Sequence, residues 1–208
     1  MAGWVWHCLS DRAAATHRAP PDGTLAPAFE AFRAHYPDIE LEVVISNQVH
    51  SLSKREADIA VRPTRNPPQT LVGQRAGSIQ QAVYGQRRHW QDVPAPLDTL
   101  ARYHWVGPDK HMGDSALETW LTQQGLDNHC HYRVDSMLGM QTAVRHGTGL
   151  AVLPCYLGDS DPELMRLTDP LSELAVPLWL LTHPDLRRVS RIRVFTQDIG
   201  EYIRQRLG

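Results

Sequence analysis

The stretch from Val134 to Leu157 constrains the fold most, because it combines a helix start, a helix stop and a buried strand in one short segment. Ser136 is typical of a helix N-cap, and Gly147 supplies the left-handed residue that ends such a helix. The residues between them place an apolar set on one helical face: Met137, Met140, Ala143 and Val144. Leu150 to Leu153 then predicts a short buried strand. This order of strand end, helix and strand is typical of an α/β fold.

Ser136 follows the carboxyl end of an expected strand, so the helix it caps directs free backbone N–H groups and a partial positive charge away from that strand end. Such a position suits a carboxylate or another small anion. A second interpretation stays open on these residues alone. In it, Ser136 caps a helix that only packs against the sheet.

Strand and helix patterns alternate along the rest of the chain, which predicts an α/β fold with largely parallel strand pairing. The expected strands are Trp4–Leu9, Glu40–Ile45, Ala57–Arg62, Leu71–Ala76, Ile79–Tyr84, His104–Val106, His129–Val134 and Pro177–Thr182. Two of the expected helices have a predicted cap: one from Thr24 to Pro37, capped by Asp22 or Thr24, and one from a Ser115–Glu118 capping box to Gly125. The others are a short helix through Val49 and Leu52, Leu97–Leu100 and Val189–Leu207. The long extended passage around Gly77 is where we expect the chain to cross between two lobes.

Composition excludes several classes of function. The net charge of -2 and the pI near 6.6 lack the basic excess of a nucleic-acid-binding chain. Three widely spaced cysteines, Cys8, Cys130 and Cys155, fit reduced thiols and a cytoplasmic location. No apolar run is long enough to span a membrane. Phosphate-loop, dinucleotide and His-Glu-x-x-His motifs are missing from the sequence, so we expect no cofactor.

Two further sequence patterns do not indicate a catalytic or a metal site. Ser115 lies in a Gly-Asp-Ser-Ala-Leu block, but the Asp-x-x-His partner that such a nucleophile needs is missing from the sequence. His129 and His131 are spaced to face the same side of a strand, yet no third and fourth metal ligand is visible. We therefore expect neither a serine nucleophile nor a metal site.

From Leu25 onward, the order of motifs resembles the effector-binding domain of LysR-type transcriptional regulators. The segments that carry the resemblance are Leu25–Phe32, Tyr36–Glu42, Ala57–Pro63, Gly147–Pro154, Leu178–Pro184 and Arg191–Phe195. The resemblance implies two Rossmann-like lobes joined by two crossing strands, as in type 2 periplasmic binding proteins. It places residues 24–78 and 177–208 in lobe I and residues 79–176 in lobe II, with residues 1–23 as an atypical N-terminal segment.

The resemblance also implies a function. A small effector, expected to be a carboxylate or an aromatic acid, binds in a cleft between the lobes of a homodimer or tetramer and controls transcription. The implied ligand-binding residues are Thr24, Ser46, Asn47, Arg62, Ser136 and Met137. An Arg62 guanidinium can hold a carboxylate bidentately, although an ion pair that closes the strand is an equal alternative. No catalytic residue is implied.

The chain departs from the family pattern at its start. The helix-turn-helix that would bind DNA does not fit into residues 1–23, so DNA binding is expected only through a part outside this chain. An Arg, His, Ala and Pro-rich segment stands where the pattern has a first strand and a Ser or Thr turn. Two alternatives keep the same fold: a solute-binding protein of a transporter, and an enzyme such as a deaminase or dehydratase with Cys155 as a reactive group.

Overall fold

The computed structural model describes residues 3–7, 25–46, 57–91, 94–112 and 114–207, with the backbone alone for residues 3–7 and 44–46. These residues form two compact units. Lobe I consists of Ala2–Ser78 and Val176–Gly208, and lobe II of Ile79–Ala175. Both units combine helices with β-strands, as the alternating pattern predicts for an α/β chain.

Lobe I is built on a five-stranded sheet with the order β2-β1-β3-β10-β4. Its elements are β1 (Gly3–His7), α1 (Ala26–His35), β2 (Glu42–Ser46), β3 (Ile59–Pro63), β4 (Val72–Ile79), β10 (Val176–Thr182) and α6 (Ser190–Leu207). Strand β1 pairs antiparallel with both β2 and β3, and β3 pairs antiparallel with β10. The expectation of largely parallel pairing is therefore wrong. Alternation in the sequence does not reveal that β1 enters between two later strands.

The register of β1 places the ends of β2 and β3 at one edge of the sheet. Trp4 lies opposite Ile45 of β2 and opposite Val61 of β3. Because β2 and β3 are both antiparallel to β1, they run in the same direction as each other. Their carboxyl ends, at Ser46 and Pro63, therefore lie at the same edge.

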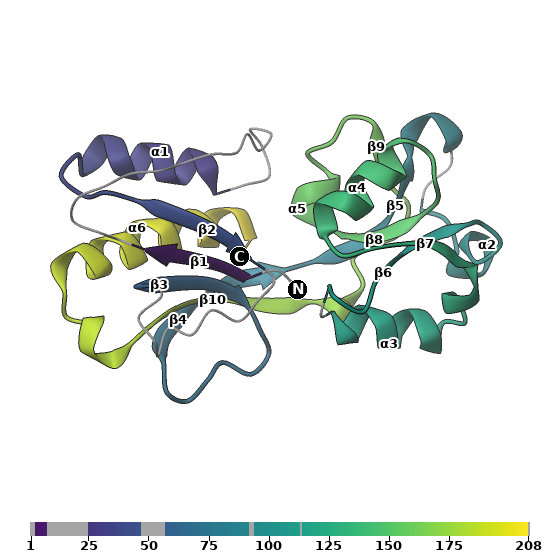
Figure 1. The fold of residues 1–208 in the computed structure, drawn as a ribbon. Coiled ribbons are helices and arrows are strands. Elements are labelled where there is room, and N and C mark those ends of the chain that lie inside the picture. The colour runs from purple at the N-terminus through teal and green to yellow at the C-terminus, as the bar shows by residue number, and fades with distance from the viewer. Residues whose placement is uncertain (1–2, 8–24, 47–56, 92–93, 113, 208) are drawn as a thin grey trace. The chain divides into compact units, whose positions relative to one another are not determined.

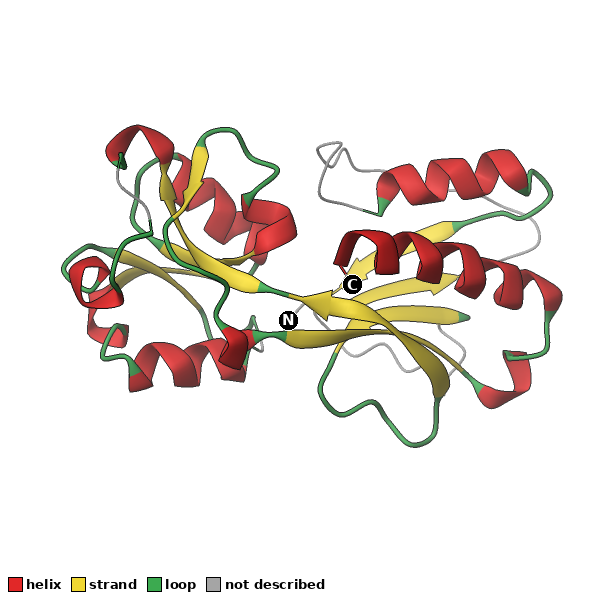
Figure 2. Ribbon diagram, turned by 180° about the vertical axis from the view of Figure 1, so that it is seen from behind, coloured by secondary structure: helices red, strands yellow, loops and turns green. Residues whose placement is uncertain are grey.

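Helices α1 and α6 lie side by side on one face of the lobe I sheet (Figures 1 and 2). The Phe195 ring of α6 packs edge-on against Phe32, with 5.1 Å between ring centroids, and stacks on Phe29 at 6.3 Å. Phe32 and Phe195 are buried. The apolar face predicted for α6 is confirmed at Ile192, Phe195, Ile199 and Ile203, whereas Tyr202 is half-buried.

Helix α1 begins differently from the expectation. Leu25 occupies its N-cap position without a side-chain hydrogen bond, and Pro27 lies in the first turn, where its fixed backbone angle suits a helix. The two residues expected to cap this helix, Asp22 and Thr24, lie outside the described residues, as does the short helix expected through Val49 and Leu52.

Lobe II holds shorter strands and more helices. Its elements are β5 (Gln81–Gln86), α2 (Leu97–Leu100), β6 (Trp105–Pro108), α3 (Ser115–Gln123), β7 (Cys130–Val134), α4 (Met137–Arg145), β8 (Ala151–Pro154), α5 (Cys155–Gly158) and β9 (Leu164–Arg166). Strands β8, β5 and β9 form an antiparallel sheet. Strands β6 and β7 pair in parallel, and a parallel bridge from Trp105 to Leu150 links β6 to the start of β8. Helices α3 and α4 lie on opposite sides of these strands (Figures 1 and 2).

The predicted capping box at the start of α3 is wrong by one residue. Asp114 is the N-cap, and its carboxylate accepts a hydrogen bond from the Leu117 N–H at 3.2 Å. Ser115 is the first helical residue instead. Asp and Ser cap helices about equally well, so propensity does not decide between two adjacent candidates.

Replacing Phe195 by Ala is expected to lower the free energy of unfolding by about 3–5 kcal/mol, since it opens a cavity between α1 and α6. Urea titration followed by circular dichroism measures the loss. Phe195→Leu fills part of the space and is expected to lose less. If the Ala variant were no less stable than a variant at exposed Gln205, the packing of α1 on α6 would not be what holds these helices.

Candidate functional site

Ser136 caps α4 as the sequence predicts. Its backbone is extended, with φ -145 and ψ 148, and its Oγ accepts a hydrogen bond from the Gly139 N–H at 3.2 Å. At the other end of the helix, Gly147 has a φ of 78, in the left-handed region that favours glycine. Both the start and the stop of the helix predicted within Val134–Leu157 are thus confirmed.

Strand β7 fixes where this helix begins. Val134, its last residue, lies opposite Pro108 of β6, and its carbonyl accepts a hydrogen bond from the Asp109 N–H at 2.8 Å. The chain then leaves the strand through Asp135 and enters α4 at Met137. The helix therefore starts just beyond the carboxyl end of a parallel strand pair, which is where α/β proteins commonly bind ligands.

The first turn of α4 has backbone N–H groups that make no hydrogen bond within the helix. The N–H groups of Met137 and Leu138 have no acceptor within the helix, because the residues four positions earlier precede it. The helix dipole adds a partial positive charge at the same place. The Met137 side chain packs partly buried against the lobe II core, whereas the Leu138 side chain is 59% exposed. Backbone N–H groups make this end suitable for an anion, because the Met137 thioether has no hydrogen-bond donor.

A buried carboxylate that the sequence analysis missed anchors the far end of α4. Asp161 Oδ2 accepts hydrogen bonds from Arg145 Nε at 2.9 Å and from Gln141 Nε2 at 3.1 Å. The side chain of Asp161 is 1% exposed, so its charge depends on these partners. Gln141 lies about one helical turn before Arg145, which is the last residue of the helix. Both are too far from Asp161 in sequence for a local pattern to predict the contact.

Arg62 lies in β3 of lobe I, opposite Trp179 of β10. It is half-buried, and within the described part of the chain no carboxylate pairs with it. The ion pair closing the strand, left open by the sequence, is not formed among these residues. The Arg62 guanidinium therefore has no carboxylate among the described residues to neutralise its charge.

Ser46 and Arg62 come close through β1. Ser46 lies opposite Gly3, and extending the β1–β3 register by one residue also places Arg62 opposite Gly3. Two strand spacings separate the backbones of Ser46 and Arg62, about 9–10 Å. The side chain of Ser46 lies outside the described residues, as do Thr24 and Asn47. Of the six predicted residues, the structure thus brings Ser136 and Met137 together in lobe II, and Ser46 and Arg62 to one edge of the lobe I sheet.

Cys155, the candidate nucleophile of the enzyme alternative, sits at the start of α5 and is half-buried. Burial raises the pKa of its thiol above the usual value, and the hydrogen bond with Tyr84 and the charge of Arg166 act against this without cancelling it. A raised pKa lowers the thiolate fraction at neutral pH, the opposite of what activates a cysteine nucleophile.

No described helix is both long and apolar enough to cross a membrane. Among the described residues, no cluster of three or more His, Cys, Asp or Glu side chains is arranged to hold a metal ion.

Ser136→Ala is expected to lower the free energy of unfolding by about 0.5–2 kcal/mol, because the Gly139 N–H loses its acceptor. Ser136→Asp keeps an acceptor and adds a charge that the helix dipole favours, so it is expected to retain wild-type stability. Urea titration compares the two variants. An Asp variant as unstable as the Ala variant would mean that the cap does not hold the start of α4.

Comparison with known proteins identifies the family. Residues 14–204 match the family model described as the LysR substrate binding domain. An HTH-type transcriptional regulator from Xanthomonas campestris pv. campestris (strain 8004) is 32% identical over 73 residues, 35% of this chain. The match spans 21% of the length of that relative.

Solved structures share the fold at lower identity. The regulatory domain of CrgA, a LysR-type transcriptional regulator from Neisseria meningitidis, is 21% identical, with a TM-score of 0.68 over 88% of this chain and 92% of that one. The effector domain of AmpR from Pseudomonas aeruginosa is 17% identical, with a TM-score of 0.65 over 89% and 90% of the two chains. Full-length AphB from Vibrio cholerae is 17% identical, with a TM-score of 0.63 over 86% of this chain and 64% of that one. On the family match over most of its length, this chain belongs to the LysR substrate-binding domain family.

Proposed function

We propose that this chain is the sensor domain of a transcriptional regulator, and that it controls transcription by binding a small organic acid. The family match over residues 14–204 is the observation that carries this proposal. The HTH-type regulator from Xanthomonas supports it. DNA binding is proposed to reside in a part of the regulator outside this chain. The proposed location is the cytoplasm, where a regulator meets its DNA.

The proposed effector contacts combine two kinds of group. At the start of α4, Ser136, Met137 and the free N–H groups of the first turn supply hydrogen-bond donors and a partial positive charge. In lobe I, Arg62 supplies a full charge with the forked geometry that matches a carboxylate. Thr24, Ser46 and Asn47 complete the proposed set. All of these groups favour an acidic effector.

Binding is proposed to act through differential affinity rather than through chemistry. An effector that binds one arrangement of the two lobes more tightly shifts the population toward that arrangement, by no more than the difference in its binding free energies. The oligomer then passes the shift to the DNA-binding part. The raised pKa of Cys155 supports a role without covalent catalysis.

Replacing Arg62 by Gln is expected to weaken binding of an acidic effector by about tenfold or more, since a charge-assisted hydrogen bond is lost. Isothermal titration of the chain with a panel of small carboxylates and aromatic acids first identifies a ligand, and titration of the variant then measures the loss. Arg102→Gln, an exposed arginine of lobe II, removes the same charge and is the matched control. No binding from the whole panel at millimolar concentration by folded protein would count against the proposal.

The outer face of α4 is proposed to take part in self-association. Leu138 is 59% exposed and Tyr132 on the neighbouring β7 is 49% exposed, both large apolar groups. They line a cavity of 470 Å³ with Val134, Thr142, Ala143 and His146. An exposed apolar surface with a polar rim is typical of a protein–protein interface. A homodimer, or a tetramer of such dimers, is the proposed assembly.

Leu138→Glu is expected to shift the chain toward the monomer, because it places a charge on this apolar surface. Light scattering at several protein concentrations measures the molar mass. Gln124→Glu, which adds the same charge at the exposed end of α3, is expected to leave the mass unchanged. Equal masses for the Leu138 variant and the unmodified chain would place the interface elsewhere.

A further inference from the structure

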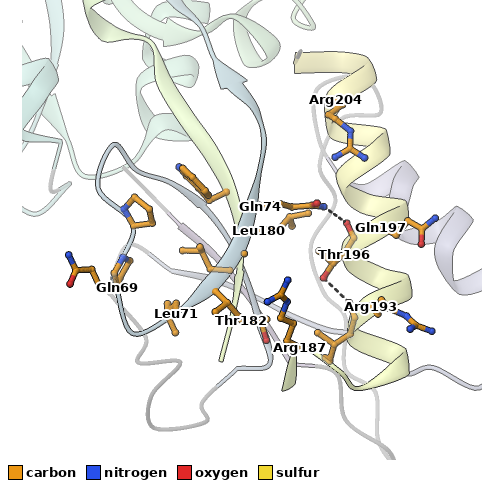
Figure 3. Close-up of a pocket in the computed structure, with 17 residues that line it drawn as sticks. Gln69, Leu71, Gln74, Leu180, Thr182, Arg187, Arg193, Thr196, Gln197 and Arg204 are labelled. Carbon is orange, nitrogen blue, oxygen red and sulfur yellow. Dashed lines mark hydrogen bonds between the residues drawn. The ribbon is translucent and has the colours of Figure 1, made fainter. Parts of the chain in front are cut away.

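A cavity of 890 Å³ lies within lobe I between β4, β10 and α6 (Figure 3). None of the residues proposed above for effector binding lines it. Its volume falls within the range of about 300–1,000 Å³ typical of small-molecule sites. The cavity is therefore large enough to hold a ligand of its own.

Helix α6 turns a polar face toward this cavity. Arg193, Gln197 and Arg204 line the cavity and recur at helical spacing on one side of the helix, opposite the buried Phe195 side. Gln74 of β4 spans to the helix, where its Nε2 donates to the Thr196 carbonyl at 3.0 Å. Gly200 makes room for this contact, because a Cβ there would lie 2.6 Å from the Gln74 Nε2. The helix is thus tied to β4 directly beside the cavity.

The charges that line the cavity are all positive among the described residues: Arg187, Arg193 and Arg204, without an aspartate or a glutamate. Arg204 is partly neutralised by Glu201 at 2.9 Å. Arg187 and Arg193 have no carboxylate partner within the described part of the chain. In Figure 3, Arg187 extends into the space between β4 and α6.

The helix dipole adds to this positive charge. Helix α6 begins at Ser190 with Arg191 and Arg193 in its first turn, and no acidic residue lies in that turn. Cations at a helix N-terminus are unfavourable by a few tenths of a kcal/mol to about 1 kcal/mol each, and a bound anion relieves that repulsion. Asp58 offsets part of this cost at Arg191, whose guanidinium lies 4.0 Å from the Asp58 carboxylate, whereas Arg193 has no carboxylate partner among the described residues. The Arg193 charge therefore costs stability unless something negative binds there.

The cavity also has an apolar lining that a ligand can reach. Leu71 just before β4, Val72 at its start and Trp179 of β10 are half-buried, whereas Leu180 and Ile192 are each 1% exposed and so are already covered. Arg193 and Arg204 are eleven residues apart, which places their Cα atoms about 16 Å apart along the helix. A free inorganic ion at one end would leave this apolar lining uncovered.

We propose that this cavity is a second binding site, for an organic anion with an extended apolar body. Its carboxylate lies at Arg187, whose guanidinium can donate paired hydrogen bonds, with Arg193 and Arg204 adding positive charge, and its apolar body lies along Leu71, Val72 and Trp179. This site is separate from the one proposed for the effector, because neither the lobe I residues of that set nor Ser136 and Met137 of lobe II line it.

Octanoate is the probe, and the Trp179 indole N–H is the reporter, since Trp179 lines the cavity and donates to the Thr64 carbonyl at 3.2 Å. The chain has six tryptophans, and Trp179→Phe identifies the resonance. Titration of the ¹⁵N-labelled 208-residue chain is expected to shift this resonance saturably at millimolar concentration. Octan-1-ol, which keeps the chain without the charge, and inorganic phosphate, which keeps a charge without the chain, are expected to bind at least about tenfold more weakly.

The double variant R187Q/R193Q is expected to weaken octanoate binding by about tenfold or more. The matched control R188Q/R206Q removes two exposed arginines that do not line the cavity, and is expected to bind like the unmodified chain. Circular dichroism checks that the variants fold. If the double variant does not fold, the single variants R187Q and R193Q take its place, each weakening binding less than about tenfold.

Four outcomes would overturn the proposal: no shift of the Trp179 resonance, equal weakening in both double variants, phosphate binding as tightly as octanoate, or octan-1-ol doing so. The Trp179 resonance could also shift with protein concentration in the absence of octanoate, and not do so in R187Q/R193Q. That result would indicate that this face is a contact between two copies of the chain, and not a ligand site. Ser136→Ala in lobe II is expected to leave the octanoate response unchanged. A failure of the effector proposal is thereby distinguished from a failure of this one.

Discussion

The buried Asp161 carboxylate is the interaction on which the arrangement of lobe II depends most. A carboxylate that is 1% exposed is several kcal/mol unfavourable unless it is paired, and here Arg145, Gln141 and the Glu163 N–H all donate to it. Two of these donors belong to α4. Because the chain between Asp161 and α4 includes β8 and α5, this carboxylate, together with the buried Met140 and Val144, holds the helix on the strands. The position of the helix in turn determines where the free N–H groups of its first turn, just after Ser136, point.

The lobe I sheet depends on pairing between segments that are far apart in the sequence. Strand β1, from the chain start, enters between β2 and β3, and β10, from near the chain end, completes the core of the sheet. Two parallel strands thus have an antiparallel strand between them, and their carboxyl ends meet at one edge. This places the backbones of Ser46 and Arg62 at the same end of the sheet, although neither the spacing nor the periodicity of the sequence reveals the order of the strands.

What could be predicted from the sequence is what local chemistry decides. The Ser136 cap and the Gly147 stop each depend on the backbone of a few adjacent residues, and both are as predicted. The α3 cap was misplaced by one residue because Asp114 and Ser115 are equally good caps, and only packing chooses between them. Strand direction and the Asp161 network join residues far apart in sequence, so no local pattern specifies them.

One face of α6 packs in the core of lobe I, and the other face carries the arginines proposed to bind an anion. The apolar positions, Ile192, Phe195 and Ile199, recur at the period that burial requires, and they are the side that α6 buries, with Phe195 packed against α1. Packing does not require arginine at 187 or 193, where an ordinary exposed polar residue would cost less beside the positive end of the helix. Charges that disfavour the free helix end and have no carboxylate partner among the described residues are better explained by something bound there than by the fold itself.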